Sequence, residues 1–280
     1  MATTLTFFGT NTLLIRRGSS ALLIDPHFTR PSLWQLTRKI EPDPRLIQDA
    51  LSNMQITHLD GVLLTHTHYD HALDAVEVIN QTGSVLYGSE SACNLAYSAG
   101  LGVQQVEKVL IGQHLRIGEF EIKIHTSRHL PFPPPLRWLS ADGQKINYPQ
   151  KLPAYFWQYA SGQVLAIQVD NILILGSAGF EPGACCGLEV DHVVLAVGGL
   201  GLRSIAYLET MYQEVVVVPG ARQVVLSHWD DFFRPLERPL RMLGRSAKSI
   251  RRIQSLGNCY GQAVKPLKPG ESIQILFKTD

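Results

Sequence analysis

The feature that most constrains the fold is a cluster of polar residues that directly follows a short apolar segment in the sequence. Residues 61–65 (GVLLT) have the composition of a buried strand. Four residues of the cluster follow within six positions: His66, His68, Asp70 and His71. Apolar residues then recur at helical spacing as far as Ile79, which predicts a helix. A strand that runs through a polar loop into a helix is typical of open α/β folds, whose sites assemble at such strand ends.

The cluster also has the composition of a metal site. Imidazole and carboxylate groups are ligands of Zn²⁺, and iron and Mn²⁺ accept them as well. Alternate residues of an extended loop point the same way, so His66 and His68 can share one ion. Asp70 and His71 come after the turn and can face a second ion beside it. A merely histidine-rich surface loop is the simpler alternative, but four unpaired polar groups beside a buried strand would be costly.

Short strands and helices are predicted along the whole chain. Strands are expected at residues 4–8, 12–16, 21–24, 61–65, 84–87, 105–111, 114–117, 119–125, 154–160, 164–169, 171–175, 193–197, 224–226 and 272–277. Further helices are expected at 44–54 (with Asp43 as N-cap), 89–99, 204–214 and in a stretch ending near 256. The proline-rich residues 126–153 break this rhythm and predict a functional loop or lid.

These elements predict one domain, residues 1–280, of the α/β or α+β class with helices covering sheets. The length allows one large domain or two small ones, and no segment has the composition of a linker. Hydrophobic residues make up 45% of the chain, which is enough for a core and excludes a disordered protein.

Charge, cysteine usage and hydropathy narrow the function classes. A net charge of +1 gives no overall preference for nucleic acid or an anionic membrane. The four cysteines form no CxxC pair, which suits a reducing compartment. No apolar run approaches the roughly 18–20 residues that cross a bilayer, and the first residues lack a signal-peptide pattern. The sequence therefore predicts a soluble, cytoplasmic protein without a membrane span, and it leaves the oligomeric state open.

The sequence resembles the metallo-β-lactamase superfamily over most of its length. The cluster matches that family's HxHxDH pattern, and residues 22–26 (LLIDP) and 60–65 (DGVLLT) resemble the strands before it. Among the branches, the chain is most similar to ascorbate-6-phosphate lactonases and N-acylphosphatidylethanolamine phospholipase D. The resemblance implies a four-layer αββα sandwich with the metals at one edge of its two sheets.

The resemblance also implies two further histidine ligands. The family's third histidine follows a strand, where His125 and His129 are the candidates. His125 continues the alternation of its strand, which favours His129. The last histidine follows a late apolar strand, and His228 fits that place. The implied ligands are therefore, for one ion, His66, His68 and His129 and, for the other, Asp70, His71 and His228.

One family position differs in this chain. The family's bridging aspartate lies in a Gly-Asp-Thr turn after a strand, whereas residues 176–179 read GSAG, with Ser177 at that place. A neutral hydroxyl is a poor ligand and cannot offset the charge of two dications. Three possibilities stay open: a single metal ion, two ions joined by a bridging water, or compensation by Asp230 or Asp231.

Other residues are candidates for supporting roles. Asp25 and Asp60 are expected to fix imidazole tautomers by hydrogen bonds, and His27 is the best pocket residue among the other histidines. Basic residues recur every three or four positions over 234–252, which on one helix would form a face for phosphate or nucleic acid. Two prolines and a glycine argue against one helix, and a solvated face is the simpler account, but Arg234 could still reach an anionic substrate.

The predicted activity is that of a metal-dependent hydrolase. The resemblance implies a metal-bound hydroxide that attacks an ester, lactone or phosphodiester bond, with Asp70 as proton acceptor. One or two Zn²⁺ ions are expected, with Mn²⁺ or iron as alternatives, together with a small anionic or ester substrate. Two other functions stay open: a metal-binding protein whose hydrolytic activity is reduced or lost through Ser177, and an RNA-processing nuclease. The near-neutral net charge disfavours the nuclease.

Overall fold

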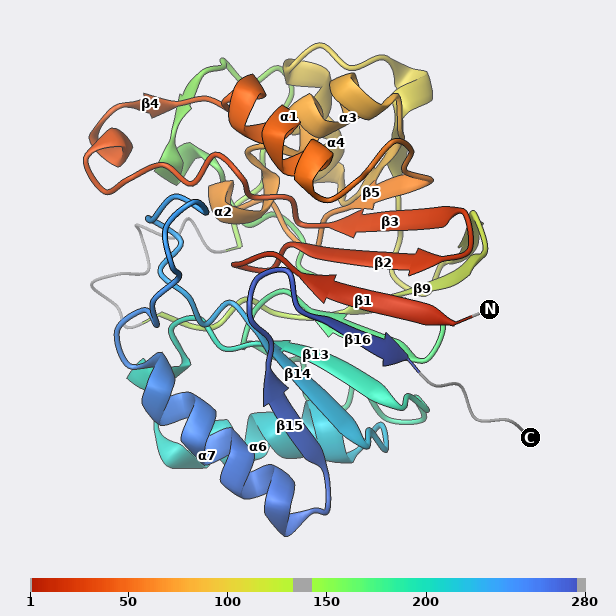
Figure 1. The fold of residues 1–280 in the computed structure, drawn as a ribbon, viewed down its shortest axis with the longest axis vertical. Helices are drawn as coiled ribbons and strands as arrows, with labels where there is room; N and C mark the ends of the chain where they lie inside the picture. Colours follow the sequence, from red (N-terminus) through yellow and green to blue (C-terminus); the bar gives the residue numbers. More distant parts are fainter. Residues whose placement is uncertain (1, 133–142, 276–280) are drawn as a thin grey trace.

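Two seven-stranded sheets face each other at the centre of the molecule, and helices cover the outer face of each (Figure 1). The computed structural model describes residues 2–132 and 143–275. Its layers run helix, sheet, sheet, helix from top to bottom of Figure 1. The predicted four-layer αββα sandwich is therefore confirmed.

The first sheet is mixed. Its spatial order is β16 (Ser272–Ile275), β1 (Thr3–Phe7), β2 (Leu13–Arg17), β3 (Ser20–Ile24), β5 (Gly61–Leu63), β6 (Leu86–Gly88) and β7 (Val106–Lys108). Neighbours from β16 to β3 are antiparallel, and those from β3 to β7 are parallel. Successive side chains face opposite layers, so Leu13 and Ile15 join the core between the sheets while Leu14 packs under the helices.

The second sheet has a parallel half and an antiparallel half. Its spatial order is β15 (Ala263–Pro266), β14 (Gln223–Ser227), β13 (His192–Ala196), β12 (Ile172–Leu175), β11 (Leu165–Val169), β9 (Phe120–Thr126) and β8 (His114–Ile117). The strands from β12 to β15 are parallel, and β11 is antiparallel to both β12 and β9. As a result β9, β12, β13 and β14 all end at the same edge.

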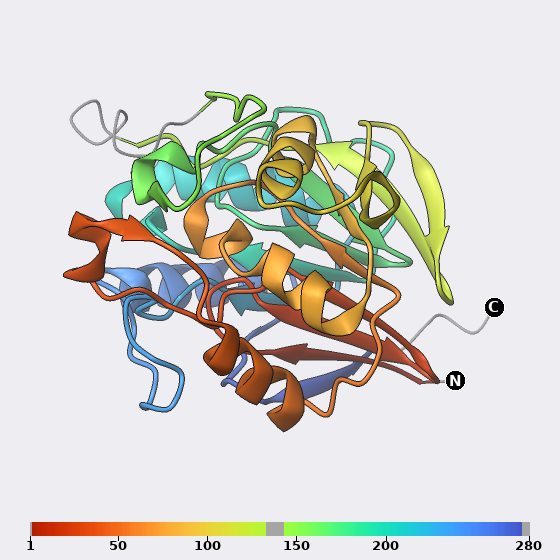
Figure 2. The ribbon, with the colours of Figure 1, turned by 90° about the horizontal axis from the view of Figure 1, so that it is seen from above.

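Helices α1 (Pro44–Asn53), α3 (Ala75–Thr82) and α4 (Glu90–Ser98) lie over the first sheet, in front of it in Figure 2. Helix α1 begins as predicted, because Asp43 accepts hydrogen bonds from the backbone N–H groups of Arg45 and Leu46. Helices α6 (Ile205–Tyr212) and α7 (Ser246–Cys259) cover the second sheet. No helix in the described ranges is long and apolar enough to span a bilayer.

Short elements complete the fold. They are α2 (Tyr69–Ala72), the 3₁₀ turns η1 (Gln35–Thr37), η2 (Val103–Gln105), η3 (Phe156–Gln158) and η4 (Leu200–Leu202), the π turn η5 (Gln213–Val217), and the pair β4 (Lys39–Ile40) and β10 (Ala154–Tyr155). Strands β4 and β15 were not predicted.

The predicted strand over 154–160 is wrong beyond its first two residues. Strand β10 stops at Tyr155 because its partner β4 is only two residues long, and η3 follows. Trp157 stacks on Tyr155 with ring centroids 4.5 Å apart instead of alternating with it across a ladder. Part of the predicted lid, residues 133–142, and the last two residues of the predicted strand 272–277 lie outside the described residues.

Candidate metal centre

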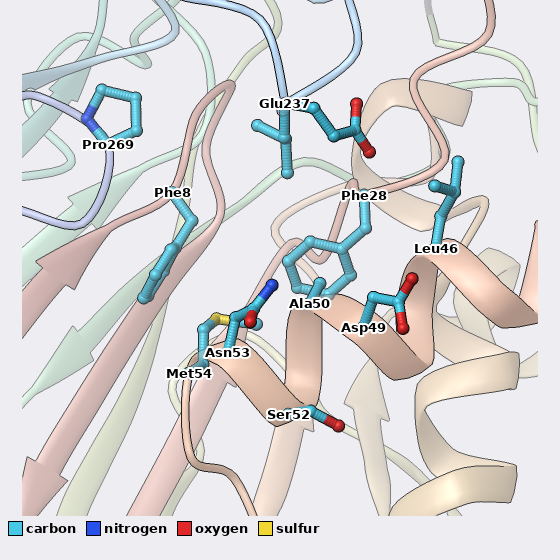
Figure 3. Close-up of a pocket in the computed structure, with 11 residues that line it drawn as sticks. Phe8, Phe28, Leu46, Asp49, Ala50, Ser52, Asn53, Met54, Glu237 and Pro269 are labelled. Carbon is cyan, nitrogen blue, oxygen red and sulfur yellow. The ribbon is translucent and has the colours of Figure 1, made fainter.

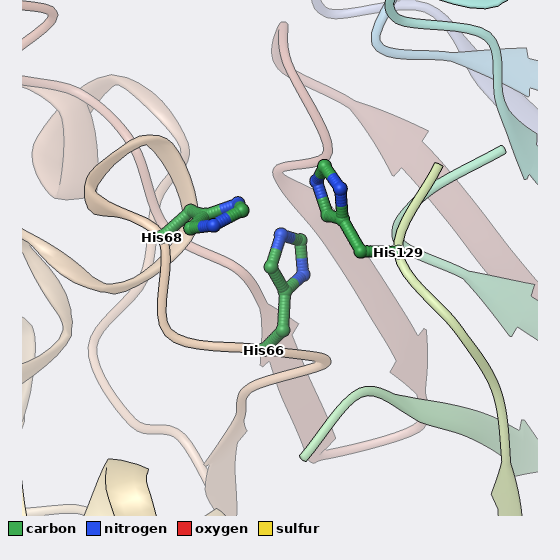
Figure 4. Close-up of side chains that lie close together, drawn as sticks. All are labelled: His66, His68 and His129. Atoms are coloured by element: carbon green, nitrogen blue, oxygen red, sulfur yellow. The ribbon is translucent and has the colours of Figure 1, made fainter. Parts of the chain in front are cut away.

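Three histidines form the first trio of potential ligands. His66 and His68 lie on the loop between β5 and α2, and His129 lies on the loop after β9. One nitrogen of each lies within 4.8 Å of the others. The ring centroid of His129 is 5.3 Å from that of His66 and 4.5 Å from that of His68. Figure 4 shows the three rings turned toward a common point, with His68 on the left, His129 on the right and His66 below.

A second trio consists of Asp70 and His71 on α2 and His228 directly after β14. His228 Nε2 lies 3.0 Å from Asp70 Oδ2, and His71 Nε2 lies 3.8 Å from the same oxygen. All three residues are buried. Each trio thus takes two residues from the loop or helix after β5 in the first sheet and one from the second sheet.

The two trios adjoin. The ring centroids of His66 and His71, one from each trio, are only 3.9 Å apart. Within the second trio, the ring centroids of His71 and His228 are 5.3 Å apart. The six residues that the sequence selected as ligands are therefore brought together, and His125 is not among them, because its Nε2 pairs with Gln168 Oε1 at 2.9 Å.

His228 points into the site because the backbone at Thr10 and at Gly198 lies close to it. Its φ of 55° lies in the left-handed region, which costs a non-glycine residue of the order of 1 kcal/mol or more. Its backbone N–H donates to the carbonyl of Thr10 at 2.5 Å. A Cβ at Gly198, after β13, would lie 2.6 Å from His228 Nδ1, so only glycine leaves room for the ring.

Asp25 supports the second trio from the end of β3. The carboxylate is fully buried, and its Oδ2 accepts hydrogen bonds from His71 Nδ1–H at 2.8 Å and from Asn11 Nδ2 at 2.7 Å. It also accepts from the backbone N–H and the hydroxyl of Thr65, at 2.8 and 2.5 Å. These bonds orient the His71 ring with Nε2 toward the trio, the role that the sequence predicted for Asp25.

Asp60, the other acid predicted to support the ligands, does not reach the centre. It lies just before β5, at the end of the strand opposite the trios, where its carboxylate accepts the N–H of Ala21 at 2.8 Å and lies 3.4 Å from His58 Nε2. The prediction fails because a strand carries its two ends to opposite edges of the sheet.

Hydrogen bonds also fix the orientation of imidazole rings in the first trio. Thr65 Oγ1 gives its proton to Asp25, so it accepts from His66 Nδ1–H at 3.1 Å. His129 Nδ1–H donates to its neighbouring carbonyl at Leu130, at 3.0 Å. His66 Nε2 is buried without a hydrogen-bond partner among the described residues. Such an orphaned nitrogen is costly in an apolar site and fits a ligand of a cation.

Burial and neighbouring charges together shift the pKa values in the two trios. Burial would lower the pKa of His71, but the carboxylates of Asp25 and Asp70 outweigh it and raise that pKa. Burial, and then the neighbouring imidazoles, hold the pKa of His66 and of His129 well below the ordinary value. Burial alone would raise the pKa of Asp70, but His71 and His228 outweigh it and hold that pKa well below its usual range. Neutral imidazoles and an ionised carboxylate are the forms that bind a metal ion.

Ser177 belongs to neither trio. It lies two residues after β12, and its Oγ accepts the backbone N–H of Leu130 at 2.9 Å. A Cβ at Gly179 in the same turn would lie 2.2 Å from the carbonyl oxygen of Arg128, so the turn presses directly against the loop that carries His129. Ser177 therefore supports the loop that carries His129.

Asp230 and Asp231 do not take over the bridging position. Asp230 forms a fully buried ion pair with Arg30 at 2.5 Å and also accepts the N–H of Thr10. Asp231 Oδ1 accepts the N–H of Phe233 at 3.2 Å. The compensation considered from the sequence is thus wrong, because other partners hold both carboxylates.

Arg30 was missed in the sequence, although it joins two distant segments. Its Nε donates to the carbonyl of Arg234 at 2.6 Å, and its Nη2 donates to that of Asp231 at 2.8 Å. The side chain of Arg234 is half-buried, and its Nε has no partner among the described residues. No local pattern marks a lone arginine that pairs with an acid 200 positions away.

His27 lies beside the second trio but is not part of it. Its ring meets Tyr69 edge-on at 5.9 Å, and both ring nitrogens are buried without a partner in the described chain. Burial, and then the charge of Arg30, lower the pKa of His27 to about 3. It is therefore neutral at any physiological pH.

A separate pocket of about 440 Å³ lies beside α1 (Figure 3). Phe8, Phe28 and Met54 give it an apolar lining, with Glu237 at its border. None of the six potential ligands lines it, so the chemistry of the trios does not take place there.

Comparison with known proteins agrees with this geometry. A family model described as the metallo-beta-lactamase superfamily matches residues 5–96, a range that includes the whole HxHxDH motif. Over this range the chain is similar to the metallo-β-lactamase superfamily. The branch that the sequence resembled stays a prediction.

Curated relatives match over less than half of the chain. A UPF0173 metal-dependent hydrolase of Pyrobaculum islandicum is 27% identical over 113 residues, which are 40% of this chain and 44% of the relative. One of Christiangramia forsetii is 33% identical over 90 residues, 32% of this chain and 34% of the relative. The matches thus span less than half the length of these relatives.

Two solved structures have a similar fold over nearly the whole chain. The metallo hydrolase Igni18 of Ignicoccus hospitalis has a TM-score of 0.60 at 17% identity and covers 99% of this chain and 100% of its own. The metallo-beta-lactamase fold protein YhfI of Bacillus subtilis has a TM-score of 0.60 at 12% identity, covering 98% and 100%. At such identities the likeness concerns the fold alone.

Proposed function

We propose that this protein is a metal-dependent hydrolase that binds two divalent cations side by side. The observation that supports this most directly is the pair of adjoining trios, in which burial holds the pKa of His66 and of His129 low, while His71 and His228 outweigh burial and hold that of Asp70 low. The first trio would bind one ion and the second trio the other. A donor set of five imidazoles and one carboxylate favours Zn²⁺, and iron and Mn²⁺ are the alternatives that the same donors accept.

Bound divalent ions lower the pKa of water toward about 7 and polarise the oxygen of the bond to be cleaved. The side chains contribute orientation and a proton acceptor. Asp70 is an ionised carboxylate in a buried site, so it would accept the proton of the attacking water. Its low pKa means that it would pass this proton on rather than retain it. Asp25 would keep the His71 ring in place during turnover.

The bond cleaved is proposed to be an ester, a lactone or a phosphodiester in a small anionic molecule. Basic side chains at the edge of the site support an anionic substrate: Arg234, Arg238, Arg241 and Arg245 follow His228 on the loop between β14 and α7. Chromogenic esters, lactones and phosphodiesters, tested in parallel, distinguish the three classes.

The test combines metal content with activity in matched histidine variants. We expect elemental analysis of the purified native chain to give two equivalents of metal, and His66→Ala to lower the content and abolish hydrolysis. His125→Ala removes an imidazole that pairs with Gln168 outside both trios, and it should leave metal content and activity unchanged. A fully metal-loaded native chain that hydrolyses none of these substrates would overturn the proposal.

A metal-binding protein without hydrolytic activity is the main alternative, and the contact of Ser177 with Leu130 favours it. That hydroxyl supplies no negative charge between two cations. If the native chain binds metal but is inactive and Ser177→Asp creates activity, the alternative is correct. Activity confined to RNA substrates would instead indicate the nuclease.

We further propose that residues 1–280 form a single domain in a reducing, cytoplasmic compartment. Both trios draw on both sheets, so neither sheet makes a complete site alone. The four cysteines are unpaired, and Cys93 and Cys185 are buried. Unfolding with coincident transitions by fluorescence and circular dichroism tests the first point, and cell fractionation tests the second.

A further inference from the structure

Exposed apolar side chains gather on the segments around the metal centre. Leu33 and Trp34 are 65% and 72% exposed, just before η1 on the segment from β3 to α1. Three more are about half exposed on the segments after β13 and β14: Leu202, Ile205 and Met242. These three strands end at the edge where the trios lie. Exposure of such large apolar side chains to water is unfavourable, and a group of them on one surface is typical of an interaction site.

Basic side chains share these segments. The exposed ones are Arg38, Lys39, Arg238, Arg241, Arg245 and Lys248. None of them forms an ion pair with a carboxylate of the described chain. We call these six cations and the five exposed apolar side chains the site rim. Although the whole chain has a net charge of only +1, these segments carry six exposed cations against two exposed acids, Glu41 and Glu237.

Direct contacts connect the segments that form the rim. Arg30, three residues before Leu33, donates two hydrogen bonds to backbone carbonyls of the loop that carries the arginines, at Asp231 and Arg234. On the other side, a Cβ at Gly201 in η4 would lie 2.4 Å from Arg245 Cβ, so η4 touches the same loop. In Figure 1 the segment around β4 and the blue loop entering α7 lie on the same side of the molecule, next to α2.

From these observations we infer that the site rim docks on an anionic lipid membrane. Tryptophan and leucine beside lysine and arginine are the residues that hold proteins in the interfacial layer of a bilayer. Single-stranded RNA would also use cations and an aromatic ring, but Leu33, Leu202, Ile205 and Met242 offer no surface for base stacking. Docking in this way places the metal centre next to the lipid surface. The inference does not depend on the proposed hydrolysis.

The first experiment is co-sedimentation of the full chain with vesicles. We expect binding to vesicles of phosphatidylcholine mixed with phosphatidylserine, and little binding to phosphatidylcholine alone. Leu33→Glu/Trp34→Glu should lower the partition coefficient more than about tenfold, because both interfacial anchors are lost. The matched control Val103→Glu/Tyr260→Glu changes two exposed apolar side chains elsewhere, at η2 and after α7, and should bind like the native chain.

A second pair of variants isolates the charge. Each cation near an anionic surface contributes roughly a fivefold factor in binding, so Arg238→Glu/Arg241→Glu should also lower it more than about tenfold. Arg116→Glu/Arg222→Glu makes the same change of charge at the opposite ends of the strands and should lower it less than about threefold. The loss caused by Arg238→Glu/Arg241→Glu should shrink in high salt.

Several outcomes would overturn the inference. One is that the native chain does not bind anionic vesicles at low salt. Another is that the rim variants and the control variants lose binding equally. If light scattering finds a dimer that Leu33→Glu/Trp34→Glu dissociates, the rim belongs to a second copy of the chain. If single-stranded RNA displaces the vesicles and binds Leu33→Glu/Trp34→Glu as well as the native chain, the cations serve RNA.

Discussion

The two trios use the same chemistry but are supported in different ways. The first consists of imidazoles only, and two of its members, His68 and His129, are partly exposed. The second contains the carboxylate of Asp70, is buried throughout, and is backed by the carboxylate of Asp25. A negative charge next to a dication strengthens binding. We therefore expect the second trio to bind metal more tightly and the first to be the replaceable position.

The largest expected effect concerns the scaffold next to the second trio. Asp230→Ala would leave Arg30 buried without its partner, which costs about 3–5 kcal/mol in the free energy of unfolding. Asp170→Ala is the matched control, because Asp170 pairs with Arg17 at the same 2.5 Å but is partly exposed. Its cost should be about 1 kcal/mol or less. Urea unfolding measures both, and equal losses would contradict the special role of the buried pair.

A pH effect should follow from Asp74, which bonds to the N–H groups of Phe28 and Thr29 beside the second trio. Burial raises the pKa of Asp74 to about 6 from its ordinary 3.8. A raised folded-state pKa gives stability that is complete below about pH 4 and lost as pH rises through 6. Relative to Asp74→Asn, the native free energy of unfolding should fall by up to about 3 kcal/mol between pH 4 and pH 7. Parallel profiles of the two proteins would refute this.

Asp25→Asn tests how the second trio is held. The amide cannot accept all the hydrogen bonds that Asp25 receives from His71, Asn11 and Thr65. Loss of such a supporting bond lowers metal affinity about 10- to 100-fold. Competition with a chelator should show this loss in the second trio and a smaller one in the first. Asp60→Asn should change neither affinity, since Asp60 bonds to Ala21 at the far end of β5.

The smallest expected effect concerns the first trio. Ser177→Ala leaves the N–H of Leu130 without its acceptor, which costs about 1 kcal/mol. The His129 loop should loosen, with a few-fold loss of affinity in the first trio only. Ser177→Thr keeps the hydroxyl and should therefore keep the native metal affinity of the first trio. Ser98→Ala removes a similar acceptor, of the Gln150 N–H, far from the trios and should leave metal affinity unchanged.

Sequence reasoning was most successful where the chemistry is contiguous. The HxHxDH motif and the strand before it marked four potential ligands, and the family resemblance implied His129 and His228. The alternation rule failed at 154–160, where apolar residues continue but β4 is too short to pair with them. Sequence patterns report a local preference, whereas a strand also needs a partner of matching length.

Contacts across long separations could not be predicted. Arg30 and Asp230 are 200 positions apart, and the bond from Leu130 to Ser177 joins loops of β9 and β12. Nothing next to these residues in the chain indicates the partner. The family comparison suggested a missing ligand at Ser177, and only the folded chain shows the supporting role that the hydroxyl has instead.

Each trio combines residues from the first sheet with one from the second, and this has a consequence for assembly. Neither half of the sandwich, expressed as a fragment, would contain a full set of donors. A mixture of two complementary fragments should therefore bind metal ions only after the fragments have associated. Metal binding by such a mixture would report the assembly of the two sheets.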